Sequence, residues 1–465
     1  MSHLAHQFAH SPSAPSGASV SSKSGSLTNK IPDAVPVRTK TNFNYGVHGW
    51  LLLFYGMINF MTAGAFWTAA AQNTAVAEFA VRIGASSATL LYWCTVAGVA
   101  ATIMMLFAGM LFDKFGTHIM GTAALLLTGI CIIIYGHINT LPAYVICFFA
   151  IFMLSSATSS FGVPQIFTSY FPTKKGSIMG WASCGSSLAS LVSLGALTWL
   201  MSKGGWELGT LVFGIFTIIM GLINWFLIPD MPEQMGVLPD NGDFDEAEMQ
   251  RRQAIIDSPT PVWTLKEGLM NKNFWLLSIA YGLLFLVNIG TVSQLVSFEL
   301  SMGLSQSQAL MYMSIMPLFA IPGSIVTGWL DQRIGARRTG IILAAFYAIG
   351  TLFGGFVPYS TATNWIFYVF TFFLVGGMSN LPQSHTCSVY GGRDYPKLWG
   401  YINPIISLIR VCNTAILAFA LSSLNGYRDA YKIFMVCSII AGVLLFFSDN
   451  NVIKDPGEKP TGVIK

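Results

Sequence analysis

The sequence predicts an all-α integral membrane protein with twelve transmembrane helices in two six-helix halves. Three observations predict this fold: the composition, the number of apolar runs and their division around one polar stretch. Of the 465 residues, 53% are hydrophobic and 9% are charged, whereas a soluble domain carries roughly 25% charged residues. So few charges cannot cover the surface of a globular protein of this size. The seven cysteines lie in apolar stretches without metal-type spacing, which indicates packing residues.

Apolar runs long enough to span a membrane occur along most of the chain. A bilayer core about 30 Å thick requires roughly 20 apolar residues of helix. The runs cover residues 48–72, 86–112, 119–138, 141–164, 177–201, 206–228, 273–297, 305–330, 339–358, 363–388, 398–422 and 428–448. Six lie on each side of residues 229–272, which hold nine of the 20 acidic residues. We therefore expect an N-terminal half at 46–228, an acidic cytoplasmic loop at 229–272 and a C-terminal half at 273–448.

The distribution of Lys and Arg predicts the orientation in the membrane. With a cytoplasmic N-terminus, nineteen basic residues face inward, four face outward, and Arg410 remains within a run. Because cytoplasmic loops are enriched in Lys and Arg, we expect both termini on the cytoplasmic side of the cell (inner or plasma) membrane. Residues 1–45 are rich in Ser, Ala and Pro without an apolar core, which predicts a disordered cytoplasmic tail and no cleavable signal peptide. We expect a second cytoplasmic tail at 449–465.

Two short patterns recur at nearly the same offset in the two halves. Residues 109–116 (GMLFDKFG) follow the second run, and residues 328–338 (GWLDQRIGARR) follow the eighth, 219 residues later. The fifth and eleventh runs contain a second matched pair, Gly180 and Gly400, which are 220 residues apart. Matched landmarks at one offset indicate an internal duplication.

These motifs resemble the signature loop of the major facilitator superfamily, written G-x-L-a-D-r-x-G-r-r. The resemblance implies two six-helix halves that rock against each other around a central cavity, and gating roles for charges in the two loops. The charges in question are Asp113, Lys114, Arg333 and Arg337. In the second copy the acid, Asp331, stands one place early, so we expect the stronger latch at Asp113.

Within this superfamily the chain is similar to the oxalate/formate antiporter group and the monocarboxylate transporters. The resemblance is carried by residues 264–276 before the seventh run, by residues 171–176 before the fifth, and by a basic residue, Arg410, within the eleventh. It implies that the substrates are small organic anions.

Arg410 is the strongest candidate for a binding residue. It lies about twelve residues into a run of about twenty-five, at a depth where an Arg costs about 2.5 to 3.5 kcal/mol. No Asp or Glu falls in the middle of any run to compensate it. Asn403, Ser407 and Thr414 share with it an arc of about 60° on one helix face. We interpret Arg410 as a cation that holds a substrate carboxylate bidentately. A structural Arg bonded to backbone carbonyls is the alternative.

Other polar residues lie in runs that the resemblance places around the cavity. Asn59, Ser156 and Asn288 are candidate substrate contacts, although each is equally compatible with a helix–helix hydrogen bond. His385 follows Pro382 in the tenth run. It is either a residue that titrates during transport or a satisfied structural histidine.

We therefore expect a secondary active transporter of mono- or dicarboxylates that works by alternating access, as an antiporter or a proton-linked symporter, and functions as a monomer. Its expected partners are the anion, the lipid bilayer, and protons or a counter-anion, without nucleic acid, metal or cofactor. The sequence contains no Gly-Lys-Ser/Thr phosphate loop and no His-Glu-x-x-His motif, which argues against an enzyme. Two alternatives remain: a carrier of a neutral solute or drug, and a membrane sensor that binds carboxylates without transporting them.

Overall fold

The structure, a computed structural model, describes residues 45–67, 69–172, 174–230, 232, 239–242, 263–373, 375–424 and 426–449. These residues all belong to one compact unit that spans residues 39–465. The predicted tails at 1–45 and 449–465, except for their inner residues 45 and 449, and most of the predicted acidic loop lie outside the described residues.

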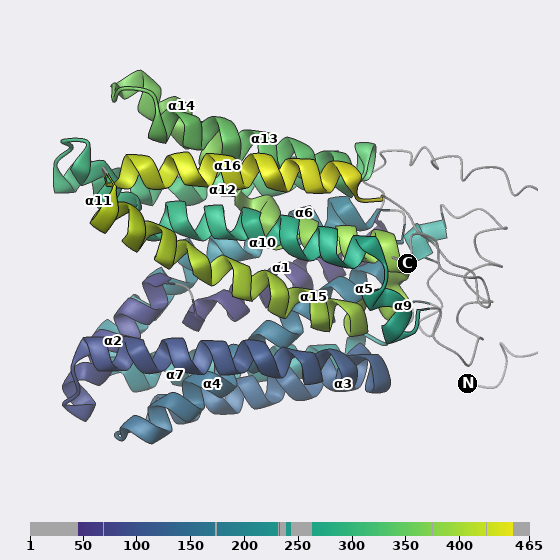
Figure 1. Ribbon diagram of the computed structural model, residues 1–465. Coiled ribbons are helices and arrows are strands. Elements are labelled where there is room, and N and C mark those ends of the chain that lie inside the picture. The colour runs from purple at the N-terminus through teal and green to yellow at the C-terminus, as the bar shows by residue number, and fades with distance from the viewer. Residues whose placement is uncertain are drawn as a thin grey trace, which may run out of the picture. The chain divides into compact units, whose positions relative to one another are not determined.

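The described residues are almost entirely helical. The N-terminal half contains α1 (Gly46–Trp67), α2 (Ala69–Ile83), α3 (Ser87–Tyr135), α4 (Leu141–Ala157), α5 (Val163–Tyr170), α6 (Lys175–Leu188) and α7 (Leu194–Leu227). The C-terminal half contains α9 (Leu265–Leu269), α10 (Lys272–Ser293), α11 (Leu295–Ser301), α12 (Gln306–Ile334), α13 (Ala336–Gly355), α14 (Thr361–Phe372), α15 (Leu381–Ser423) and α16 (Tyr427–Phe447). Figure 1 shows α3, α4 and α7 on one side of the bundle and α13, α14 and α16 on the other.

Three of these helices are too long to be single spans. The 49 residues of α3 would extend about 74 Å at 1.5 Å per residue, more than twice the thickness of a bilayer core. Non-helical backbone divides each long helix at a glycine with positive φ: Gly116 in α3, Gly205 in α7 and Gly391 in α15. Each of these glycines adopts a conformation that side chains with a Cβ rarely adopt.

Counting the divided segments yields the predicted number of spans. Within the described residues, nine helical stretches are long and apolar enough to cross a membrane. Two of the nine contain Gly116 and Gly205 and therefore hold two spans each, and the 22-residue helix α1 supplies the first span. The twelve predicted spans are confirmed, whereas α2, which contains polar and charged residues, was not predicted as a separate helix.

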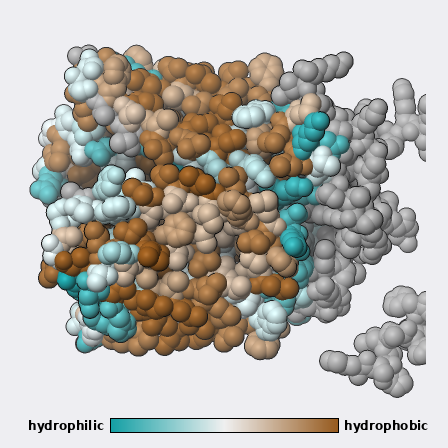
Figure 2. Space-filling model, turned by 60° about the horizontal axis from the view of Figure 1, so that its bottom comes forward, coloured by the Kyte–Doolittle hydropathy of each residue, from teal (hydrophilic) through white to brown (hydrophobic). Residues whose placement is uncertain are grey.

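The surface matches a protein that is embedded in lipid. Figure 2 shows a broad apolar band across this face of the bundle, with hydrophilic residues gathered toward its two ends. Large apolar side chains of many spans are exposed, among them Phe226, Leu408 and Phe447. The structure therefore confirms a multi-pass membrane protein.

The two halves touch where the duplicated motifs lie. We call this the motif end, and we call the other side, with the turns at Gly84, Gly205 and Gly426, the opposite end. At the motif end Gly180 of α6 lies so close to Gly328 of α12 that a Cβ on Gly180 would come within 2.6 Å of the Gly328 Cα. Only glycines allow helix backbones to approach this closely.

Further contacts close the same end. A Cβ on Gly109 of α3 would lie 2.6 Å from the Pro396 carbonyl oxygen of α15. The Tyr395 hydroxyl donates to the Ser160 carbonyl (2.5 Å), and the Thr168 hydroxyl contacts the Cys387 sulfur at 3.4 Å. At the opposite end, the polar contacts found among described residues remain within one half, for example Arg82 with Glu207. The structure is therefore a conformation closed at the motif end.

Candidate functional site

Arg410 lies deep within the second span of α15. It is 16 residues beyond Asp394 and 13 before Ser423, the limits of the apolar stretch, or about 24 and about 20 Å along the helix axis. At neither end can a side chain of this length easily reach the membrane surface. The sequence prediction of a mid-membrane cation therefore agrees with the helix bounds.

The guanidinium of Arg410 has no protein partner in the part of the chain that the structure describes. No ion pair or side-chain hydrogen bond is found for it there. The alternative of an Arg that bonds backbone carbonyls therefore finds no support in these contacts.

The remaining residues of the predicted polar face lie on the same continuous helix. Ser407 is buried and Asn403 is half-buried, while the side chain of Thr414 is not described. Asn413 is also buried, and its amide donates to the Arg410 carbonyl oxygen at 2.6 Å. Sequence reasoning missed Asn413.

Helix α10 packs directly against the helix that carries Arg410. A Cβ on Gly282 of α10 would lie 2.8 Å from the nearest atom of Ile409, the residue before Arg410. The two helices are therefore closely packed beside Arg410.

The other three residues predicted to contact substrate have neighbours within their own halves. Asn59 is 1% exposed and lines a small internal cavity of the N-terminal half together with Tyr55. The Asn288 amide donates to the Tyr347 hydroxyl at 2.7 Å, between α10 and α13. Ser156 is half-buried in α4, where its carbonyl accepts the Ser159 hydroxyl at 3.2 Å. None of these contacts joins Arg410, so their role toward substrate stays a prediction.

The four predicted gating charges lie at the rim of the motif end. Asp113, Lys114 and Arg333 are exposed, with Lys114 over the Phe115 ring and Arg333 over the Trp329 ring. Arg337 is half-buried and donates to the Phe446 carbonyl within the C-terminal half.

Asp331, the acid of the second motif copy, lies at the interface between the halves in this conformation, and the relative strength of the latches at Asp113 and Asp331 stays a prediction. Asp331 is 8% exposed, accepts the Ser384 hydroxyl at 2.5 Å, and lies against Gly176 in the first turn of α6, across the interface between the halves. An acid at a helix N-terminus is favourable because of the helix dipole. Asp331 therefore lies at the interface despite its one-place shift in the motif.

His385 is completely buried and both of its ring nitrogens have partners. Nε2 lies 3.0 Å from the Asp449 carbonyl oxygen, and Nδ1 lies 3.0 Å from the Tyr281 hydroxyl. A carbonyl oxygen only accepts hydrogen bonds, so Nε2 carries a proton, and the neutral ring is satisfied when Nδ1 accepts from Tyr281. These contacts favour the structural interpretation of His385.

The structure also buries a carboxyl group that lies outside the predicted runs. Glu299 of α11 is 0% exposed at the opposite end. It lies two residues beyond the predicted end of the seventh run, and its position in sequence contains no signal for burial. Among the described residues, no three His, Cys, Asp or Glu side chains gather as a metal site would require.

These observations define a class of membrane protein: a twelve-span bundle of two related halves, in contact at one end, with a cation in the membrane interior that has no partner among the residues described. The model of the Major Facilitator Superfamily matches residues 52–411, and the chain belongs to this superfamily.

Relatives of this chain include a membrane sensor and two antiporters. The chain is 24% identical to the membrane sensor protein UhpC of Salmonella typhimurium, over 64% of this chain and 71% of the relative. It is 23% identical to the hexose-6-phosphate:phosphate antiporter of the same organism, over 75% and 76%. It is also 23% identical to the oxalate:formate antiporter of Oxalobacter formigenes, over 73% and 77%.

A solved structure shares the fold. The proton:xylose symporter XylE superposes with a TM-score of 0.64 at 14% identity, over 85% of this chain and 95% of that chain. The predicted fold and family are confirmed.

Proposed function

We propose that this protein is a secondary active transporter of small organic anions, and that Arg410 binds the negatively charged group of the substrate. The observation that carries the proposal is the Arg410 guanidinium, which lies deep in a span and has no ion-pair or hydrogen-bond partner among the described residues. An isolated cation at this depth is unfavourable, and a bound carboxylate would compensate it through two parallel hydrogen bonds.

The relatives support an anionic substrate but do not indicate which anion it is. Those named above handle a hexose phosphate with phosphate, or oxalate with formate. A guanidinium matches either carboxylate or phosphate geometry. We favour mono- and dicarboxylates. A cationic substrate would be repelled by Arg410, and a neutral solute would leave its charge uncompensated.

The proposed cycle alternates between two conformations. We place the motif end in the cytoplasm, because most basic residues then face the cytoplasm. The closed motif end then corresponds to a state in which substrate reaches Arg410 from outside. Ser407 and Asn403, on the same helix face, would contact the rest of the anion, and Thr414 completes that face. Rocking of the halves separates α6 from α12 and α3 from α15, which opens the route inward.

Counterflow in proteoliposomes tests this proposal. Vesicles loaded with an unlabelled mono- or dicarboxylate are mixed with the labelled anion, using the wild type, Arg410→Gln, Arg410→Lys and the exposed control Arg338→Gln. We expect accumulation with the wild type and the control, loss with Arg410→Gln, and a weakened response with Arg410→Lys because a Lys cannot bind bidentately. Full uptake by Arg410→Gln would refute the role of Arg410.

One observation favours a second candidate. The relatives include a membrane sensor, so this chain is alternatively a receptor that binds an anion without moving it. Binding of a labelled carboxylate to the purified protein, abolished by Arg410→Gln, together with an absence of counterflow, would favour the sensor over the transporter.

A further inference from the structure

Glu299 is a buried acid with an unused oxygen at the opposite end of the C-terminal half. It lies in α11, the short helix that follows α10, and it is completely buried. Oε2 accepts a hydrogen bond from the Asn364 amide at 3.2 Å, whereas Oε1 has no partner among the described residues. A buried carboxylate oxygen without a donor is costly, so this carboxyl favours a form with less charge.

Aromatic side chains enclose the carboxyl. Phe298, the residue before Glu299, stacks on Tyr431 of α16 with ring centroids 4.4 Å apart, and packs on Phe367 of α14 at 5.5 Å. The hydroxyls of Tyr431 and Tyr368 also lack partners among the described residues, and the Glu299 charge acts on both. These two hydroxyls are the donors that an ionised Glu299 would recruit.

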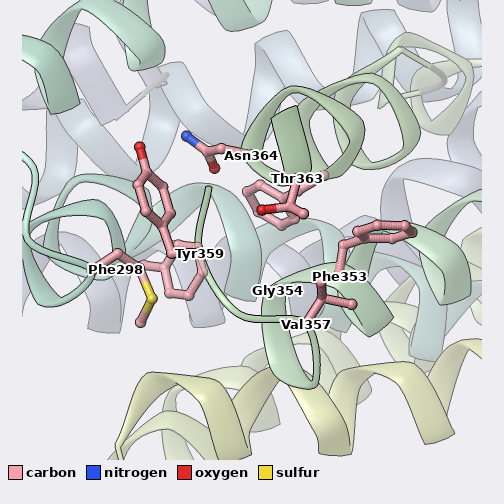
Figure 3. Close-up of a pocket in the computed structure, with 9 residues that line it drawn as sticks. Phe298, Phe353, Gly354, Val357, Tyr359, Thr363 and Asn364 are labelled. Atoms are coloured by element: carbon pink, nitrogen blue, oxygen red, sulfur yellow. The ribbon is translucent and has the colours of Figure 1, made fainter. Parts of the chain in front are cut away.

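A recess lies beside this group, and Asn364 lines it while donating to Glu299. The recess has room for about one water molecule. Figure 3 shows Asn364 at the recess beside Phe298, with Tyr359 and Thr363 also lining it. Asn364 therefore contacts the recess on one side and the Glu299 carboxylate on the other, and a water in the recess would lie one hydrogen bond from that link.

The charged groups nearby have other partners. On α16, Arg428 donates to the Val357 carbonyl oxygen at 2.5 Å, and Lys432 pairs with Asp429 at 2.6 Å. The other titratable groups that face Glu299 are tyrosines: Tyr312, Tyr359, Tyr368 and Tyr431. None of the described cations is close enough to hold Glu299 in its ionised form.

We propose that Glu299 is a proton-binding site, loaded from the opposite end through the recess beside Asn364, and that its proton is coupled to anion transport. The ligand is a proton because the recess is too small for an organic molecule and because a lone carboxyl surrounded by rings lacks the oxygen ligands that a metal cation needs. The coupling rests on the proposed transport function; proton binding itself does not.

The packing offers a path from this site to Arg410. The α11 segment continues directly from α10, and the Tyr427 hydroxyl of α16 donates at 3.1 Å to Gln294, the residue between the two helices. α10 in turn contacts Ile409 through Gly282. A change in how α11 packs between α14 and α16 therefore reaches the helix that carries Arg410 through continuous contacts.

Titration supports the geometry. Burial raises the pKa of the Glu299 carboxyl above its usual range, and the hydrogen bond from Asn364 offsets part of the rise. Between the unfolded and the folded pKa, the folded protein holds a proton that the unfolded chain has lost. The stability contributed by the neutral group is therefore present at low pH and is lost as pH rises through the folded pKa.

Thermal unfolding of the purified full-length protein between about pH 5 and pH 8 measures this effect. Glu299→Gln mimics the neutral acid and cannot titrate. We expect the Tm of Glu299→Gln minus the Tm of the wild type to increase with pH. The difference at pH 8 should exceed the difference at pH 5 by about 2–4 °C. Glu78→Gln, which removes a carboxylate paired with Arg82 at 2.8 Å at the same end, is the matched control. A constant offset for Glu299→Gln would overturn proton binding.

Net anion uptake tests the coupling. With acid outside proteoliposomes, we expect faster labelled-carboxylate uptake by the wild type and loss of this acceleration in Glu299→Gln. Equal acceleration in both would overturn the coupling. If the wild type moves no anion while its stability still shows the expected pH dependence, the proposed transport function fails and proton binding at Glu299 stands.

Discussion

The contact between Gly180 and Gly328 allows a quantitative prediction about opening of the motif end. In Gly180→Ala the added Cβ would lie 2.6 Å from the Gly328 Cα and 2.8 Å from the Ser324 carbonyl oxygen, whereas ordinary contacts are 3.4–4 Å. The neighbours are backbone atoms, so the halves must separate by about 1 Å to accept one methyl group. Overpacking of this kind costs about 1–3 kcal/mol. Because the cost applies only to the closed state, the ratio of open to closed molecules should rise about 5- to 150-fold.

Alkylation of Cys387 by a maleimide reports this change, with mass spectrometry of the labelled peptide as the readout. Cys387 is buried in the closed conformation, where its sulfur contacts Thr168 of the other half at 3.4 Å. Opening of the motif end separates these residues and exposes the thiol, so the labelling rate should rise with the open population. The matched control is Gly195→Ala in α7, since a Cβ there meets nothing within 4 Å.

Two results would refute the reasoning. An unchanged rate of Cys387 labelling in folded Gly180→Ala would mean that the closed interface absorbs the methyl group without opening. An equal increase in Gly195→Ala would mean that labelling reports a general loosening of the bundle and not the separation of α6 from α12.

Two further predictions concern stability. Arg82→Ala should lower the free energy of unfolding by about 1–2 kcal/mol, because Arg82 bonds Glu78 at 2.8 Å and Glu207 at 2.5 Å. Thermal unfolding measures this loss, and Arg82→Lys should recover part of it. Equal stability of the wild type and both variants would contradict the prediction. Asn288→Leu should cost about 0.6 kcal/mol through loss of its bond to Tyr347 and leave the KM for the anion unchanged; a raised KM would instead make Asn288 a substrate contact, as the sequence predicted.

The spans were predictable because each depends on local properties. A run of about twenty apolar residues forms a membrane helix whatever its neighbours are, and glycines such as Gly116 and Gly335 mark turns that only they adopt easily. The family was predictable for a related reason, since the duplicated motifs lie in those turns. Arg410 was recognised as a candidate binding residue because an Arg in the membrane interior is unfavourable, and its position in a span can be read from one sequence.

Features that depend on packing between distant segments were not predictable. Glu299 is buried because α11 packs between α14 and α16, and only Asn364 and the tyrosines of those helices make the site. The importance of Asp331 arises from Gly176 in the other half of the chain. The direction in which the Asn59 side chain points from α1 also depends on the neighbouring helices. The depth of a polar residue in a span therefore did not show whether it faces a substrate cavity.

Arg410 and Glu299 make different demands on an empty transporter. When an empty cavity closes, Arg410 loses water without gaining a partner, and the effective penalty for a buried ion is several kcal/mol. A penalty of about 4 kcal/mol slows the return step about 10³-fold. A bound anion removes it, whereas a proton on Glu299 does not, because no described contact joins Glu299 to Arg410. We therefore expect exchange of anions to be faster than net uptake even when a proton gradient is applied. Equal rates of exchange and net uptake, measured in the same vesicles, would mean that Arg410 stays hydrated throughout the return step.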